Sequence, residues 1–425
     1  MMNEITLFVA VVLALVLFFV PKRLVVVVFV VAACFVPAEQ RVILADLDFT
    51  VLRVMVLTML LRAWTYGEVR PIRWTSLDKL VLVWALVRAT IYMMQWRTFG
   101  AMIYESGALL DILGVYWLVR QYVSSWNDIR PIVITLAASV LILLPFVLWE
   151  SATGMNPFAV LGRVHTALRE TETRAQGPFP HSILLGLFWA TAVPLFWATA
   201  KGSRPAWLFW AAIASSTIIT MCTRSSTPIL TLFVALGLMQ IFKFRPYGKE
   251  MAYTLGASIV ALHIVMTQPV WHLFARVGVV AGSTGYHRYR LIDSAIGHFS
   301  EWAVLGIRST GHWGWGLQDV TNEYILEGVR GGAVSLILFL WILGKAIRIT
   351  WRYSLRAPSL SSKWLGWSFS ASIIAHAVAF FGVSYFGQSR ILFYLTLAMA
   401  GMVAETQTVV KSRSPKLAEA QLRMA

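Results

Sequence analysis

Charge is scarce in this chain. Only 13% of its 425 residues are Asp, Glu, Lys or Arg, whereas 58% are hydrophobic. A soluble globular domain carries about 25% charged and about 45–50% apolar residues. This balance excludes an ordinary soluble enzyme and indicates an integral membrane protein.

Cysteine is nearly absent as well, and the two cysteines, Cys34 and Cys222, both lie within apolar runs. They behave there as small hydrophobic residues, so we expect neither a disulfide framework nor a zinc site. The outer acidic residues form no recognisable metal-ligand pattern, so no metal or cofactor is predicted. The net charge of +16 is scattered between apolar runs, which is why no nucleic-acid partner is expected.

Apolar runs of about 15–25 residues follow one another along the chain, and each fits a helix crossing a hydrocarbon core about 30 Å thick. The fold class predicted is all-α: one polytopic membrane domain, residues 1–425, with about 12–13 transmembrane helices. The first two apolar runs are short enough to form one re-entrant hairpin, so the number of membrane crossings is left open. Spans are expected near residues 5–20, 24–37, 43–65, 79–94, 99–123, 129–149, 181–200, 206–222, 229–243, 251–268, 333–350, 366–386 and 391–405.

The basic segments between these spans indicate an orientation. If successive spans run in opposite directions, all of these basic segments lie on the same side of the membrane. The positive-inside rule assigns that side to the cytoplasm. The basic segments are Pro21–Arg23, Arg70–Arg73, Lys201–Arg204, Lys243–Lys249, Arg352–Lys363 and a basic tail, 406–425. Two long segments, 150–180 and 269–332, are then predicted to lie outside, and the second to contain an amphipathic helix over 291–302.

Every cation predicted to lie outside is an arginine. Because the guanidinium group binds phosphate oxygens through two parallel hydrogen bonds, this bias favours a phosphorylated ligand. Anchoring to lipid headgroups, or chance in an arginine-rich genome, would give the same pattern. The outer set is Arg41, Arg97, Arg163, Arg169, Arg174, Arg224, Arg276, Arg288, Arg290, Arg308, Arg330 and Arg390.

Three outer stretches carry the chemistry. "RAQGPFPHS", residues 174–182, holds an arginine near the membrane surface before a Gly-Pro turn. "TRSSTPIL", 223–230, is a short turn wedged between two spans. "HRYRLIDSAI", 287–296, places two arginines before an apolar stripe, and "GWGLQDVTNEYILEGVRGG", 314–332, follows it as a Gly-rich loop that leads into a span.

These stretches resemble motifs of the O-antigen ligase and O-antigen polymerase superfamily of bacterial membrane glycosyltransferases. The resemblance lies in their order, their spacing and the side of the membrane on which they are predicted to lie. The resemblance extends from the middle spans to the end of the chain. It implies metal-independent transfer of a glycan from an undecaprenyl diphosphate carrier to an acceptor glycan, which is either lipid-linked or lipid A-core. It also implies a multi-pass protein of the inner (cytoplasmic) membrane, with a periplasmic active site, that contacts membrane lipid and works with other polysaccharide assembly proteins.

The chain departs from the ligases at one position. Where they typically carry histidine before asparagine, this sequence has Thr321 before Asn322. A threonine cannot take a proton from an acceptor hydroxyl as an imidazole can. The departure favours a polymerase of O-antigen or exopolysaccharide over a ligase.

The resemblance and the chemistry of a departing diphosphate together give a set of expected site residues. Arg174, Arg224 and one of Arg288 or Arg290 are expected to bind the diphosphate. The expected sugar and acceptor contacts are Tyr286, Tyr289, Trp313, Trp315, Ser225, Asn322 and His181. The general base is left open among Asp319, Glu323 and His312.

Two rival functions come from other classes. A transporter or flippase of a lipid-linked glycan would favour broken helices at the midplane and an internal repeat, neither of which the sequence carries. A purely structural membrane scaffold would not account for a long outer loop with an amphipathic helix.

Overall fold

The computed structural model describes residues 2–44, 47–162, 167–169, 172–202, 204–276 and 285–422. The outer segments predicted at 150–180 and 269–332 thus lie partly outside the described residues. About 79% of the chain is helical. The long helices are α1 (Glu4–Phe19), α2 (Val25–Phe35), α3 (Val51–Thr65), α4 (Ser76–Trp96), α5 (Phe99–Leu109), α6 (Val115–Tyr122), α7 (Trp126–Thr153), α8 (Ser182–Gly202), α9 (Ala206–Cys222), α10 (Ser226–Gln240), α11 (Gly248–Val265), α13 (Gly285–Gly297), α15 (Glu323–Arg356), α16 (Leu360–Ala379) and α17 (Gln388–Leu422).

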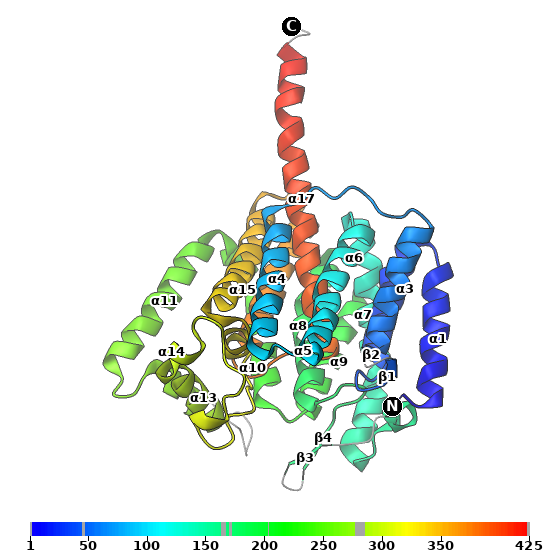
Figure 1. Ribbon diagram of the computed structural model, residues 1–425. Helices are drawn as coiled ribbons and strands as arrows, with labels where there is room; N and C mark the ends of the chain where they lie inside the picture. The colour runs from blue at the N-terminus through cyan, green and yellow to red at the C-terminus, as the bar shows by residue number, and fades with distance from the viewer. Residues whose placement is uncertain are drawn as a thin grey trace.

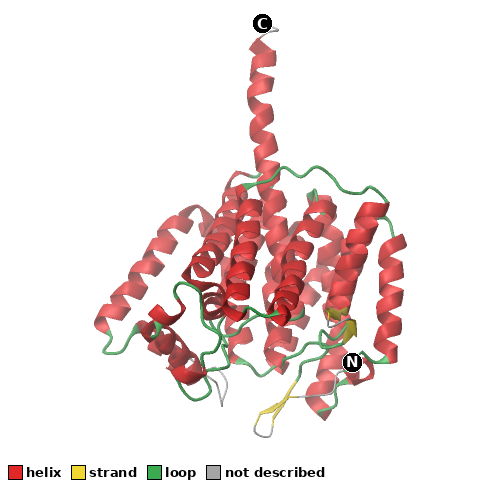
Figure 2. Cartoon of the chain, viewed as in Figure 1, coloured by secondary structure: helices red, strands yellow, loops and turns green. Residues whose placement is uncertain are grey.

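The helices stand side by side in one bundle (Figures 1 and 2). Among the described residues, five segments are long and apolar enough to cross a membrane, which supports a membrane protein at this level. They are Phe99–Tyr122, Trp126–Thr153, Ser182–Gly202, Ser226–Val265 and Glu323–Arg356. Each of the thirteen predicted ranges overlaps a helix; the number of crossings stays a prediction.

The boundaries differ from the prediction in three places, the third being the predicted span 366–386, whose helix ends at Ala379. The first part of the predicted span 43–65 instead belongs to a hairpin of β1 (Arg41–Leu44) and β2 (Leu47–Thr50). The helix begins after it because Thr50 caps its N-terminus, accepting a hydrogen bond from the Arg53 N–H at 3.3 Å. A second hairpin, β3 (Ala167–Arg169) with β4 (Glu172–Arg174), lies in the first outer segment. The all-α prediction therefore needs these two small sheets added.

The second difference is that α15 starts at Glu323, well before the predicted span near 333. Asn322 caps it by accepting a hydrogen bond from the Ile325 N–H at 3.1 Å. The helix is interrupted at Gly332, whose φ of 66° and ψ of −177° are not helical. The last part of the predicted loop is thus a helical segment.

The predicted amphipathic helix is present but divided. It consists of α13 and a short α14 (Phe299–Trp302), separated at His298. Leu291 and Trp302 are buried in a small separate core, whereas Ile296 and Phe299 are about half exposed. The predicted stripe is therefore only partly turned inward, and the helix that carries it is broken at His298.

Helix α8 is the centre of the bundle and packs against α9, α10 and α16. Its first residues lie at the end of the molecule that carries β3, β4 and α13, opposite the end from which α17 projects (Figure 1). We call these the hairpin end and the tail end. The central helix thereby carries its N-terminal turn into the hairpin end, where the predicted site residues lie.

Charged groups inside the bundle are paired. Arg88 is 4% exposed and lies 3.5 Å from carboxylate oxygens of both Glu105 and Glu327. Arg53 forms an ion pair with Asp111 at 2.9 Å. Buried charges are tolerated only when they are compensated in this way, so these pairs join α4 to α5 and α15, and α3 to the segment after α5.

Candidate functional site

A cavity of about 280 Å³ opens at the hairpin end. It contains five of the residues predicted from the sequence: Arg174, His181, Ser225, Arg288 and Asp319. The remaining described lining residues are Ile183, Ser226, Thr321, Gly382, Val383, Ser384 and Phe386. Residues far apart in the chain therefore contribute to one polar site.

Arg174 is held in place by the turn that follows it. The buried Glu150 carboxylate accepts hydrogen bonds from the N–H groups of Gln176 at 3.2 Å and Gly177 at 2.8 Å. Gly177 adopts a left-handed φ of 51°, which a side chain would strain. The guanidinium then donates from Nε to the Thr223 carbonyl at 3.3 Å and from Nη2 to the Ser225 hydroxyl.

Arg224 and Ser225 occupy the turn between α9 and α10 but differ in position. The Ser225 hydroxyl donates to the Thr223 carbonyl at 2.9 Å and is 1% exposed at the cavity wall. Arg224 is half-buried, has a left-handed φ of 47°, and is not among the described lining residues. The turn thus presents its serine to the cavity.

Arg288 and Arg290 are separated by the geometry of α13. Arg288 is 8% exposed and donates from Nε to the Gly382 carbonyl at 3.1 Å, at the cavity. Arg290 lies beside the loop residue Gly314: its Nη2 is 2.6 Å from the position that a Cβ on that glycine would take. Of the two alternatives left by the sequence, Arg288 is the one that lines the cavity.

The three candidate bases lie in three different places. Asp319 is the only carboxylate among the described lining residues and is exposed. Glu323 is buried in the first turn of α15, where its Oε2 accepts a hydrogen bond from the Tyr385 N–H at 2.6 Å. His312 contacts Glu301 instead, at 2.7 Å. That contact holds the pKa of the Glu301 carboxyl below its ordinary value.

The aromatic candidates lie outside the described cavity wall. Trp313 is buried, stacks on His298 and donates to Glu301 at 3.1 Å. Trp315 is 91% exposed. Tyr286 is 62% exposed and packs near Tyr289, 6.0 Å between ring centroids. These exposed rings are free to meet a ligand larger than the cavity, whereas Trp313 stabilises the loop.

His181 and Asn322 serve the ends of helices. The Nδ1 atom of His181 accepts a hydrogen bond from the Ile183 N–H at 3.1 Å, so the ring proton of the neutral imidazole resides on Nε2. The side-chain amide of Asn322 donates to the Phe381 carbonyl at 3.2 Å while its oxygen caps α15. His181 lines the cavity, and Asn322 fixes the loop after α16 to α15.

Some residues that line the cavity were not among the predicted site residues. Thr321, Ser226 and the loop of residues 382–386 also line the cavity. Gly382 is required there because a Cβ would come within 2.4 Å of the Thr227 hydroxyl. The prediction includes residues 381–386 in the span 366–386, whereas α16 ends at Ala379. The signal available was the Gly- and Ser-containing run "FGVSYFG", 381–387, which favours a turn.

Several of the arginines predicted to lie outside have local roles elsewhere. Arg41 pairs with Asp48 at 2.8 Å, and Arg390 donates to the Tyr385 carbonyl at 2.6 Å. Arg163 lies outside the described residues, and the side chain of Arg169 is not described. Part of the arginine-only pattern thus has a structural cause.

Chemically, the cavity combines two guanidinium groups, neutral hydroxyl and imidazole donors, and one carboxylate. Such a set can bind an anion and accept a proton. Within the described residues no group of three or more His, Cys, Asp or Glu side chains is arranged to hold a metal ion. A scan of the chain against protein-family models and a search of curated proteins both found no match.

Proposed function

We propose that the chain is a membrane glycosyltransferase of the O-antigen ligase/polymerase type. It transfers an oligosaccharide or polysaccharide from undecaprenyl diphosphate to an acceptor glycan during synthesis of a surface polysaccharide. The site faces the periplasm from the inner membrane, in a bundle of 12–13 spans. Polymerisation is favoured over ligation to lipid A-core, because Thr321 stands where the ligases typically carry histidine.

In the proposed reaction an acceptor hydroxyl oxygen attacks the anomeric carbon of the donor sugar. The bond from that carbon to the diphosphate oxygen breaks, and its electron pair leaves with the polyprenyl diphosphate. The hydroxyl proton passes to the Asp319 carboxylate. No electron is gained or lost overall, and the negative charge that develops on the departing oxygen is the charge the site has to stabilise.

The observation that carries this proposal is the joint presence of Arg174 and Arg288 in one cavity. They come from separate segments, and each is anchored by a backbone carbonyl, at Thr223 and Gly382. Fixed donors of this kind need little reorganisation when charge develops, and their effect is large where water is scarce. The His181 Nε2–H supplies a neutral donor to the same anion, while the Ser225 hydroxyl, which donates to the Thr223 carbonyl, holds the Arg174 guanidinium in place.

Asp319 is the base that this geometry favours, since it lines the cavity and Glu323 and His312 do not. The exposed rings of Tyr286 and Trp315 and the half-buried ring of Tyr289 are assigned to the sugars beyond the cavity. Arg224 is assigned no direct contact with the diphosphate.

The test is an assay with purified full-length protein, a polyprenyl-diphosphate-linked oligosaccharide and a chelator of divalent cations. We expect release of free polyprenyl diphosphate together with a lengthened glycan. A flippase would move the donor across liposomes without releasing the carrier. Transbilayer movement with no carrier release would reject the transferase proposal, and transfer to lipid A-core alone would replace polymerisation by ligation.

A further inference from the structure

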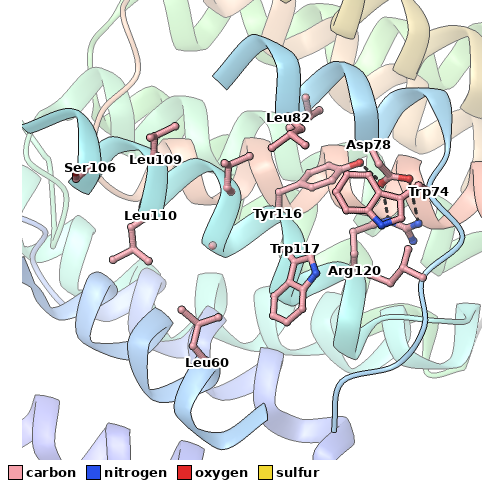
Figure 3. Close-up of a pocket in the computed structure, with 14 residues that line it drawn as sticks. Leu60, Trp74, Asp78, Leu82, Ser106, Leu109, Leu110, Tyr116, Trp117 and Arg120 are labelled. Carbon is pink, nitrogen blue, oxygen red and sulfur yellow. Dashed lines mark hydrogen bonds and ion pairs between the residues drawn. The ribbon is translucent and has the colours of Figure 1, made fainter. Parts of the chain in front are cut away.

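A second and larger cavity, of about 490 Å³, lies away from the candidate site, along α3, α4, α5 and α6. Figure 3 shows its walls: Leu60 comes from one side, Leu82 from the other, and Leu109, Leu110 and Trp117 from the helix between them. We call it the α5–α6 groove. The other lining residues are Ile72, Trp74, Asp78, Val81, Ser106, Leu113, Gly114, Tyr116 and Arg120. Its volume falls within the about 300–1,000 Å³ typical of small-molecule sites.

The groove is long and apolar. Its lining runs along the α5–α6 helix from Ser106 to Arg120. Ser106 and Arg120 are separated by fourteen steps of about 1.5 Å, which gives a length of about 21 Å and exceeds half of the roughly 30 Å hydrocarbon core. An extended hydrocarbon chain matches this shape better than a compact solute does.

A local irregularity in the helix faces the groove. Residues Leu110–Gly114 form a π-helical turn, and Leu110, Leu113 and Gly114 all line the cavity. A Cβ on Gly114 would come within 2.8 Å of Val56, so the glycine allows this turn to approach α3. Single π turns inside α-helices are often found at functional sites.

One end of the groove is closed by a polar network (Figure 3). The Asp78 carboxylate accepts hydrogen bonds from the Tyr116 hydroxyl at 2.7 Å and from Arg120 Nε at 3.0 Å. Arg120 also contacts Glu405 of α17 at 3.0 Å. This network ends the apolar surface and places a polar boundary at the tail end of the bundle.

Positive charge is in excess around that boundary. Arg73 and Lys79 are exposed there, and Trp74 between them is 54% exposed. Tryptophan favours the membrane–water interface, and basic residues there attract anionic lipid headgroups. The charged side chains around the boundary are four cations and two carboxylates. The cations are Arg70, Arg73, Lys79 and Arg120, and the carboxylates are Asp78 and Glu405.

We propose that the α5–α6 groove binds one acyl chain of an anionic phospholipid, whose phosphate lies at Arg73, Lys79 and Trp74. The apolar length accommodates the chain, the Asp78–Tyr116–Arg120 network marks the depth of the headgroup, and the excess of cations selects an anionic lipid. This lipid is distinct from the glycan donor, because its headgroup lies at the tail end rather than the hairpin end.

The test uses full-length protein purified in detergent and native mass spectrometry with added phosphatidylglycerol or phosphatidylcholine of the same chains. We expect one retained phosphatidylglycerol, held about tenfold more strongly than phosphatidylcholine. Leu82→Trp, which fills the groove, should weaken retention about tenfold. The matched control is Leu340→Trp, at a 48% exposed position on α15, and it should leave retention unchanged.

Two further variants keep the result interpretable. Leu60→Phe narrows the groove from α3 if Leu82→Trp fails to fold, as judged by a monodisperse elution profile. Arg73→Gln combined with Lys79→Gln should remove the preference for phosphatidylglycerol while leaving one lipid bound. The proposal would be overturned if the wild type retained both lipids equally, or if neither groove variant changed retention. It would also be overturned if the groove preferentially captured polyprenyl phosphate or a second copy of the chain. None of these readouts depends on glycan transfer.

Discussion

Arg288 and Arg290 are two residues apart on one helix, yet they meet different neighbours. Two residues along an α-helix correspond to a rotation of about 200°, so the side chains leave opposite faces. Arg288 reaches the Gly382 carbonyl, and Arg290 lies against Gly314. The sequence predicted that one of them binds the diphosphate; the choice depended on which face of α13 meets the loop after α16.

The first prediction uses this pair as its own control. Arg288→Lys keeps the charge but loses the planar fork, so turnover should fall about 10²–10³-fold, as when one donor to a developing oxyanion is removed. The turnover of Arg290→Lys should stay within about threefold of the wild-type turnover, since Arg290 is not among the described residues that line the cavity. Initial rates of carrier diphosphate release measure both. Equal losses in the two variants would contradict the assignment of Arg288.

The second prediction concerns Asp319. Replacement by asparagine removes the proposed proton acceptor at nearly constant shape, and kcat should fall about 10²–10⁴-fold. Asp293→Asn is the control, because the Asp293 Oδ1 accepts a hydrogen bond from Trp271 at 3.0 Å, away from the cavity. Undiminished turnover of Asp319→Asn would move the role of base to another group.

At the scale of elements, α15 contains the least expected feature. The sequence "RGG", 330–332, predicts the end of a loop. In the structure, however, helical residues lie both before and after Gly332. Its φ and ψ fall in a region essentially reserved for glycine, and a Cβ would come within 2.5 Å of the Val304 carbonyl. This bend joins the outer core around Trp302 to the bundle.

The third prediction compares two glycines of this helix. Gly332→Ala should destabilise the protein by about 1–3 kcal/mol, through backbone strain and the contact with Val304. Gly344→Ala should be neutral or stabilise by up to about 1 kcal/mol, since no atom lies near its Cβ position and alanine favours helix. Thermal unfolding in detergent measures both. A Gly332→Ala protein as stable as Gly344→Ala would contradict the account of the bend.

At the scale of the whole molecule, the sequence predicted the helices far better than their meeting points. Continuous apolar runs are a direct consequence of burial in lipid, and each predicted range overlaps a helix. The hairpin of residues 41–50 was missed because its strands are as apolar as the span that follows. The cavity brings together Arg174, Ser225 and Arg288 from three segments, and no local period in the sequence predicts such long-range packing.

The fourth prediction tests the orientation. In a background with Cys34→Ala and Cys222→Ala, Trp315→Cys at the hairpin end should react with a membrane-impermeant thiol reagent in intact cells. Ser361→Cys, in the first turn of α16 at the tail end, should react only after the membrane is opened. The reason is that the part of α15 after the bend at Gly332, residues 333–356, is about 36 Å long at about 1.5 Å per residue and separates the two ends. The reverse labelling pattern would invert the proposed topology.

The most direct measurement is the position of the diphosphate in a structure of the full-length protein bound to polyprenyl diphosphate. The account predicts phosphate oxygens at charge-assisted hydrogen-bonding distance, about 2.7–2.9 Å, from the guanidinium groups of both Arg174 and Arg288. The polyprenyl chain should leave this cavity toward the lipid. A diphosphate bound at Arg224 or Arg290, or outside the cavity altogether, would contradict the central claim.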